Sequence, residues 1–337
     1  MTRHGCEMLI DYWHFARSNP RFLGFGFFLA FISSAGQTYF IGVFGSGIQA
    51  DFGLDAGSWG RTYMLGTLAS ALLINWTGSL IDRFDLRAFT AATLIGLSCA
   101  CFVMGSVTSP LLLVFAIFML RQFGQGLSSH AGITSMARYH SADRGKAIAL
   151  AAIGFACGEA TLPVFGLYAS QIWGWRETFR GVALIVLCSI PFALWLLRGH
   201  GSRHAAHNDA LDKRSQENTG QIEYTRRQAI TESRFYFMLP AMIAPSMIGT
   251  ALFFFPAEIT SAKNWSNLWL TGNYWLYSLV SVLTTIYSGI LIDRFSARRV
   301  VPFFLLPMAL SLVVLNVSDH PYVVWHRKVP PITRLTR

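Results

Sequence analysis

The chain has 337 residues, of which 53% are hydrophobic and 13% are charged, and its formal net charge is +10. Soluble domains usually carry about 25% charged residues, so the composition excludes an ordinary soluble protein. Residues 1–20 are polar and mixed in charge, which argues against a cleavable signal peptide. The excess of basic residues could indicate nucleic-acid binding, but their placement along the chain gives a different explanation.

Long stretches of the chain contain no Asp, Glu, Lys or Arg, and a membrane-spanning helix needs about 20 mostly apolar residues. Seven such stretches are too many to bury inside a protein of this size. They are residues 22–44, 62–81, 88–120, 181–197, 235–257, 264–292 and 300–318. Because irregular backbone cannot face lipid, we predict an all-α membrane protein. The nine predicted helices are 22–44, 60–81, 88–107, 111–134, 147–171, 178–197, 235–257, 269–292 and 299–317.

The basic residues predict the orientation of these helices. With a cytoplasmic N-terminus, the inner segments carry 18 Lys and Arg and the outer loops carry 4. This bias follows the positive-inside rule, so the basic residues orient the protein rather than bind nucleic acid. We expect a multi-pass protein of the plasma (inner) membrane with its N-terminus in the cytoplasm.

One charged decamer occurs twice, as GSLIDRFDLR at 78–87 and as GILIDRFSAR at 289–298. The two copies lie 211 residues apart, and the same offset relates the first predicted helix to the seventh and the third to the ninth. The chain therefore predicts two pseudo-symmetric helical bundles. They are a complete six-helix N-terminal half (1–197) and about three helices of the C-terminal half (235–317), joined by a polar cytoplasmic linker (198–234).

The pattern G-x-L-x-D-R-x-x-x-R between the second and third helices resembles the signature loop of the major facilitator superfamily. Its weaker second copy is also typical of that family. Further segments resemble other family motifs: the fourth-helix Arg121-Gln-Phe-Gly124-Gln-Gly126, the basic loop 138–146, and the aromatic turn Trp173-Gly-Trp175-Arg176. The resemblance covers about residues 20–317 and implies a secondary transporter.

The resemblance implies a gating role for the doubled decamer, which in the family latches one half of the transporter against the other. The implied residues are Gly78, Asp82, Arg83, Arg87, Gly289, Asp293, Arg294 and Arg298. We expect Gly78 to allow close approach of a neighbouring helix. The alternative is that each decamer is only a topology signal with a tight turn.

The repeat also predicts a second half that ends near residue 408, about 71 residues beyond the end of this sequence. The segment 318–337 ends in HRKVPPITRLTR, which cannot span a bilayer, and we expect it to be an atypical tail. The competing hypothesis is therefore that the chain is a C-terminally truncated, non-transporting remnant of such a transporter.

Two ionisable residues lie inside predicted spans, where charge is costly and indicates a functional site. Arg121 in the fourth helix and Glu159 in the fifth are expected at similar depth. We predict that they pair, or that Arg121 binds an anionic substrate while Glu159 carries a coupling proton; a purely structural ion pair is the alternative. The weaker candidates for lining a cavity are Gln37, His130 and Asn273.

We therefore expect a transporter that moves a small solute, with an organic anion favoured, by alternating access and with ion coupling, as in a symporter. No P-loop occurs, which argues against an ATP-driven pump. No enzyme activity and no cofactor is expected. No metal site is expected either, because most of the cysteines lie within predicted spans and the histidines of 198–234 lie in a polar segment typical of a solvated loop. The expected partners are the lipid bilayer, the small-molecule substrate and protons, with no nucleic acid.

Overall fold

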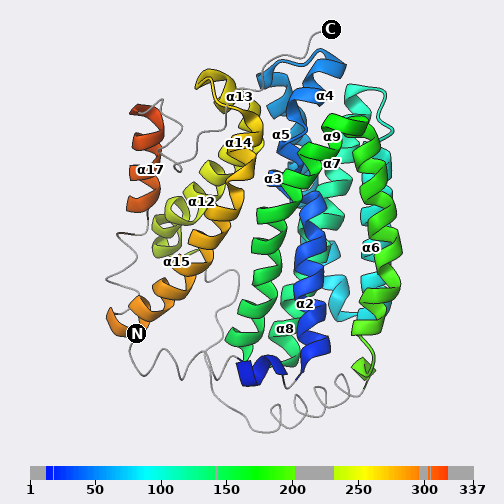
Figure 1. The fold of residues 1–337 in the computed structure, drawn as a ribbon. Coiled ribbons are helices and arrows are strands. Elements are labelled where there is room, and N and C mark those ends of the chain that lie inside the picture. The colour runs from blue at the N-terminus through cyan, green and yellow to red at the C-terminus, as the bar shows by residue number, and fades with distance from the viewer. Residues whose placement is uncertain are drawn as a thin grey trace.

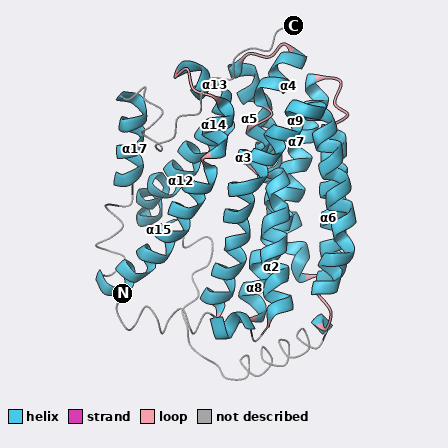
Figure 2. Cartoon of the chain, viewed as in Figure 1, coloured by secondary structure: helices cyan, strands magenta, loops and turns pink. Residues whose placement is uncertain are grey.

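The computed structural model describes residues 13–17, 19–140, 143–201, 231–295, 303 and 305–317. All regular structure in these residues is helical (Figure 2), which confirms the all-α prediction. The first-half helices are α2 (Pro20–Ile32), η1 (Ser33–Gly36), α3 (Thr38–Gly42), α4 (Gly45–Phe52), α5 (Ala56–Thr77), η2 (Gly78–Asp82), α6 (Leu86–Met104), α7 (Pro110–Leu120), η3 (Arg121–Ser128), α8 (Ser129–Tyr139) and α9 (Arg144–Leu196). The second-half helices are α12 (Ser233–Phe254), α13 (Pro256–Ala262), α14 (Asn267–Gly272), α15 (Tyr274–Phe295) and α17 (Leu306–Val317).

Five helical segments of the described chain are long and apolar enough to cross a membrane, namely Pro20–Gly42, Ala56–Ile81, Leu86–Met104, Pro110–Tyr139 and Arg144–Leu196. A sixth is obtained if the bent pair Ile243–Phe254 and Pro256–Ala262 counts as one span. These segments agree with the predicted helices of the first half and with the seventh. Of the predicted ninth helix, 299–317, the structure describes a continuous helix over Leu306–Val317 alone.

The longest segment, α9, contains two predicted helices. Its 53 residues would extend roughly 80 Å as one straight helix, far more than a bilayer is thick. Gly174 interrupts it with φ 81° and ψ 160°, a conformation that an L-residue with a β-carbon rarely adopts. The chain reverses there, so the segment forms two antiparallel legs, as expected for spans 147–171 and 178–197.

The first predicted helix, 22–44, is not one continuous helix, and that prediction is wrong in this respect. It consists of α2, a 3-10 turn over Ser33–Gly36, an extended residue at Gln37 (φ −84°, ψ 154°) and the short α3. Sequence hydropathy did not indicate this break, because the residues on both sides of it are apolar or small. Broken helices occur at membrane depth only where they are buried in protein or line a cavity.

The fourth predicted helix also departs from regular geometry at its polar centre. Residues Arg121–Ser128 form a π-helical segment between α7 and α8. Such segments are rare and are frequently found at functional sites. The segment packs directly on the break in the first helix, since a β-carbon at Gly36 would lie 2.1 Å from the Leu120 carbonyl oxygen and 2.8 Å from Gly124 Cα.

The two halves of the chain form separate groups of helices in Figure 1. The first half, coloured blue to green, lies on the right, and the yellow to red helices of the second half lie to its left. In this view α12 and α15 approach the first half near α13 and α14 and slope away from it toward the end at which α2 begins. The arrangement is that of two bundles that meet at one end.

Glycines set the closest helix contacts, although not at every predicted position. A β-carbon at Gly154 would lie 2.2 Å from the Phe27 carbonyl oxygen, and one at Gly158 would lie 2.0 Å from Ser34 Oγ. The G-x-x-x-G pair of α9 therefore packs on the first helix. Gly78 is different, because its nearest neighbour, His130, would lie at an ordinary 3.7 Å. The expectation of an unusually close helix approach at Gly78 is therefore wrong.

We predict that Gly36→Ala destabilises the protein, because the added methyl group has no room beside the Leu120 carbonyl. Overpacking of this kind costs about 1–3 kcal/mol, and the measurement is the thermal unfolding midpoint in detergent. Gly181→Ala is the matched control, since nothing lies within 4 Å of the position of its β-carbon. An unchanged midpoint in Gly36→Ala would contradict the packing described here.

Candidate functional site

Arg121 lies at the first residue of the π-helical segment and is buried, with 8% of its surface exposed. Its Nη1 donates to the Gly36 carbonyl oxygen at 3.3 Å and to Thr38 Oγ1 at 3.2 Å. The Thr38 hydroxyl is in turn 2.6 Å from the Tyr63 hydroxyl, and the guanidinium lies 5.4 Å from the centre of the Tyr63 ring. The break in the first helix thus supplies the carbonyl and the hydroxyl that hold Arg121 in place.

No carboxylate neutralises Arg121 among the residues that the structure describes. The ion pairs in that part of the chain are Asp143–Lys146, Asp51–Arg176 and Glu177–Arg180, all of them partly exposed. A buried charge without a counter-charge is costly, and its remaining N–H groups favour an anion. The geometry therefore suits the binding of a small carboxylate or other anion at Arg121.

Glu159 lies on the first leg of α9 and faces the second half of the chain. Its Oε2 accepts a hydrogen bond of 3.0 Å from Ser278 Oγ on α15. Tyr39 of the first half and Tyr274 of the second both pack against the Phe253 ring, at 6.1 and 5.0 Å between ring centres. The Tyr274 hydroxyl is buried and has no hydrogen-bond partner within the described residues. This group could therefore accept or donate a bond to a bound ligand or water.

The structure does not pair Arg121 with Glu159, so the predicted ion pair is not formed. Each of them lies instead beside a different part of the broken first helix. Arg121 binds Gly36 and Thr38, whereas Gly158, the neighbour of Glu159, packs against Ser34. The broken segment lies between the two charges, and this position explains why each has a different partner.

The three weaker candidates are placed in three different environments. Gln37 is the extended residue of the break, is half-buried, and makes no side-chain hydrogen bond to a described residue. His130 is exposed and contacts Gly78, with its Nδ1 3.2 Å from Thr134 Oγ1. Asn273, in the turn between α14 and α15, donates from Nδ2 to the Trp269 carbonyl oxygen of α14 at 2.7 Å. Gln37 is thus the one that remains beside Arg121 with a free amide.

The decamer residues are described only in part. Arg87 donates from Nε and Nη2 to the Leu197 carbonyl oxygen at 3.3 and 2.9 Å, so it binds the end of α9 in its own half. Arg83 is exposed. The structure does not describe the side chains of Asp82, Asp293 and Arg294 or the surroundings of Gly289. Arg298 lies outside the described residues altogether.

The two halves meet through aromatic and polar contacts near α4 and α13. Phe254, at the end of α12, lies 4.0 Å from Tyr63 and 4.8 Å from Trp59 between ring centres. A β-carbon at Gly42 would lie 2.1 Å from the Phe253 carbonyl oxygen, so the two backbones touch. Gln49 Nε2 donates to Glu258 Oε1 at 2.8 Å. Tyr63 therefore contacts both Arg121 and the second half.

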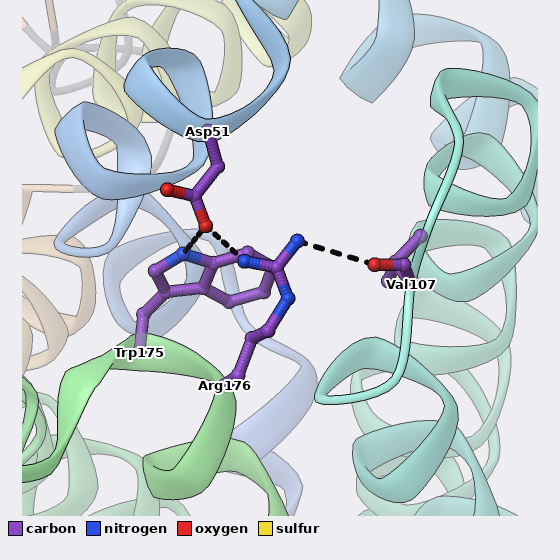
Figure 3. Close-up of polar contacts among 4 residues, drawn as sticks. All are labelled: Asp51, Val107, Trp175 and Arg176. Atoms are coloured by element: carbon purple, nitrogen blue, oxygen red, sulfur yellow. Dashed lines mark hydrogen bonds and ion pairs between the residues drawn. The ribbon is translucent and has the colours of Figure 1, made fainter.

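A polar cluster within the first half ties the aromatic turn to α4 (Figure 3). Asp51 Oδ2 accepts from Trp175 Nε1 at 2.9 Å and forms an ion pair with Arg176. Arg176 also donates from Nη2 to the Val107 carbonyl oxygen at 3.2 Å and lies 4.3 Å from the centre of the Trp175 ring. The Trp-Gly-Trp-Arg turn thus fastens three segments at one end of the bundle.

Sequence reasoning missed the hydroxyl partners of both charged residues. Tyr63 and Ser278 contact Arg121 and Glu159 from helices that are distant in sequence, and neither stands out in its own apolar segment. Gln122 was also missed; it is buried and bridges Ser70 and Thr77 of α5. The one signal in the sequence was that each is a polar residue inside an apolar segment. Polar residues occur there as often for packing as for function, so the signal did not single them out.

The comparisons with known proteins agree with this architecture. A family model described as Major Facilitator Superfamily matches residues 26–326, which is most of the chain. A search of curated proteins gives no match to the sequence.

We predict that Asp51→Asn lowers the free energy of unfolding by about 1 kcal/mol, because a neutral amide weakens the bonds to Trp175 and Arg176, which are partly exposed. The control is Asp143→Asn, which removes an ion pair of one helical turn with Lys146 and should change stability by only a few tenths. Thermal unfolding of both variants in detergent makes the comparison. Equal effects would contradict the fastening role of Asp51.

Proposed function

The chain belongs to the major facilitator superfamily and is a multi-pass membrane transporter of that family, and we propose that it moves a small organic anion together with a proton by alternating access. The chemical class of the solute and the coupling are our proposal. The observation that carries it is the buried Arg121, which has no carboxylate partner among the described residues.

The solute site is proposed at Arg121 and the break in the first helix. A monocarboxylate could use the guanidinium N–H groups that Gly36 and Thr38 leave unoccupied, because Nη1 alone binds those two partners. We propose that Tyr63, whose ring lies 5.4 Å from the guanidinium, and Gln37, which stands between Gly36 and Thr38 in the chain, bind the rest of a small polar anion. Charge, rather than size, is thus the first property that this site selects.

The coupling site is proposed at Glu159. Glu159 contacts Ser278 on the opposite half. When it is protonated, Glu159 is neutral and needs no counter-cation while the two halves move past each other. An anion at Arg121 and a proton at Glu159 together add no net charge to the protein. Symport of the two is therefore the arrangement that this pair of sites supports.

The division of the chain into two halves and its orientation in the membrane are proposed from the internal repeat and from the distribution of basic residues. The six-helix half is 1–197, the linker is 198–234, and 235–317 belongs to the second half, with the N-terminus on the cytoplasmic side of the plasma membrane. Both decamers then lie on that side, and we propose that Asp82, Arg83 and Arg87 with Asp293, Arg294 and Arg298 take part in gating there. The contacts of Phe254 close the opposite end.

We predict that Arg121→Gln raises the KM for [14C]pyruvate and [14C]lactate uptake into proteoliposomes by at least about tenfold, which corresponds to roughly 1.4 kcal/mol. Arg61→Gln is the control, because Arg61 is exposed and, within the described part of the chain, donates to Ser58 of its own helix. Thermal unfolding of each variant separates lost binding from lost folding.

Two results would refute the anion proposal. One is an Arg121→Gln protein that folds and transports both monocarboxylates with unchanged KM. The other is a wild-type protein, reconstituted and folded, that takes up neither monocarboxylate but takes up a neutral or cationic solute.

We predict that Glu159→Gln abolishes the dependence of uptake on an imposed pH gradient, while exchange of the anion across the membrane persists. Glutamine can still accept the bond from Ser278 but cannot carry a proton. Glu177→Gln removes an exposed carboxylate that pairs with Arg180 and should leave the gradient dependence intact. Uptake by Glu159→Gln that still follows the pH gradient would show that another group carries the proton.

A further inference from the structure

Two arginines, Arg87 and Arg198, line a cavity between the start of α6 and the end of α9. The cavity has a volume of about 610 Å³. It is lined by Asp85, Arg87, Ala88, Ala91, Pro191, Leu194, Trp195 and Arg198. Because α6 begins and α9 ends here, the cavity lies where two membrane spans leave the hydrocarbon layer.

The polar side of this cavity has unused positive charge. The side chain of Arg198 is exposed and has no hydrogen bond or ion pair with any residue in the described part of the chain. Arg87 uses Nε and Nη2 on the Leu197 carbonyl and leaves Nη1 unoccupied. The two guanidinium groups therefore face the same opening with donors to spare.

The one carboxylate in the lining does not cancel this charge. Asp85 Oδ2 accepts from the backbone N–H groups of Arg87 and Ala88 at 3.0 and 3.4 Å, which makes Asp85 the N-cap of α6. A capping carboxylate is held by the amides and the positive end of its helix. Asp85 thus faces the backbone rather than either guanidinium.

The other side of the cavity is apolar and accessible from the membrane. Trp195 is 43% exposed, and Pro191, Leu194 and Ala91 complete the wall. Tryptophan at the end of a span is typical of the headgroup layer, where its ring contacts both apolar chains and polar groups. A free anion would use the arginines but would gain nothing from this wall.

We propose that this cavity binds the headgroup of an anionic phospholipid, with its phosphate on Arg198 and Arg87 and the upper part of its acyl chains against Trp195 and Leu194. Arginine forks match phosphate geometry, and basic pockets between membrane helices bind acidic lipids in this way. The bound lipid would join α6 to the end of α9 beside the decamer loop, through the same Arg87 that binds Leu197. The site is separate from the solute site and does not depend on the identity of the solute.

The test measures retention of lipid by the purified full chain in detergent, using native mass spectrometry with phosphatidylglycerol and with phosphatidylcholine. The wild-type protein should retain phosphatidylglycerol preferentially, and Arg198→Gln should weaken that retention about tenfold, since a charge-assisted contact to phosphate is lost. Arg17→Gln is the matched control, because Arg17 lies before α2, at the same end of the bundle, and contacts Trp13 instead.

Two further arms distinguish the source of the phosphate. Trp195→Ala should weaken phosphatidylglycerol retention while leaving the binding of inorganic phosphate unchanged, and millimolar inorganic phosphate should not displace the lipid from the wild type. The proposal is overturned if both lipids are retained equally, if Arg198→Gln behaves as the wild type or as Arg17→Gln, or if inorganic phosphate displaces the lipid.

Discussion

The rest of the structure depends on the hydrogen bond from Arg121 to the Gly36 carbonyl oxygen at the break in the first helix. A helix that stops inside a membrane leaves carbonyl groups without donors, and each costs several kcal/mol if unsatisfied in hydrocarbon. A buried guanidinium needs acceptors for the same reason. The break and the charge therefore stabilise each other, and Gly36 and Gly124 allow it because neither has a β-carbon to separate the two segments.

This arrangement keeps the buried Arg121 apart from the half-buried Glu159, and their separation bears on the proposed function. A direct Arg121–Glu159 ion pair would have neutralised both groups and left no site for an anion. Instead, the segment Ser33–Gln37 contacts Arg121 on one side and the neighbour of Glu159 on the other. A shift of this one segment would change the surroundings of both residues together, as the proposed coupling of an anion to a proton requires.

The sequence predicted the membrane-spanning segments of the first half, because charge-free runs are local patterns that the membrane enforces. It did not predict the break at Ser33–Gln37, since small and apolar residues satisfy a hydropathy pattern whether or not the helix is continuous. Arg121 and Glu159 were identifiable because charge in a span is rare. Their partners Tyr63 and Ser278 were not, because those contacts join helices distant in sequence and depend on how the bundles pack.

The contacts between the halves explain how such a protein can change state at low cost. Among the described residues they include the Gln49–Glu258 and Glu159–Ser278 hydrogen bonds, the packing of Phe253 and Phe254 on the first half and that of α14 and α15 on α9, and no ion pair joins the halves there. A hydrogen bond contributes about 0.5–1.5 kcal/mol net, so these polar contacts are within reach of what a bound solute can offset. A solute must favour one state by about 5.5 kcal/mol to reverse a 99:1 equilibrium. Because Tyr63 contacts both Arg121 and Phe254, the proposed anion at Arg121 would act beside the ring on which Phe254 of the second half packs.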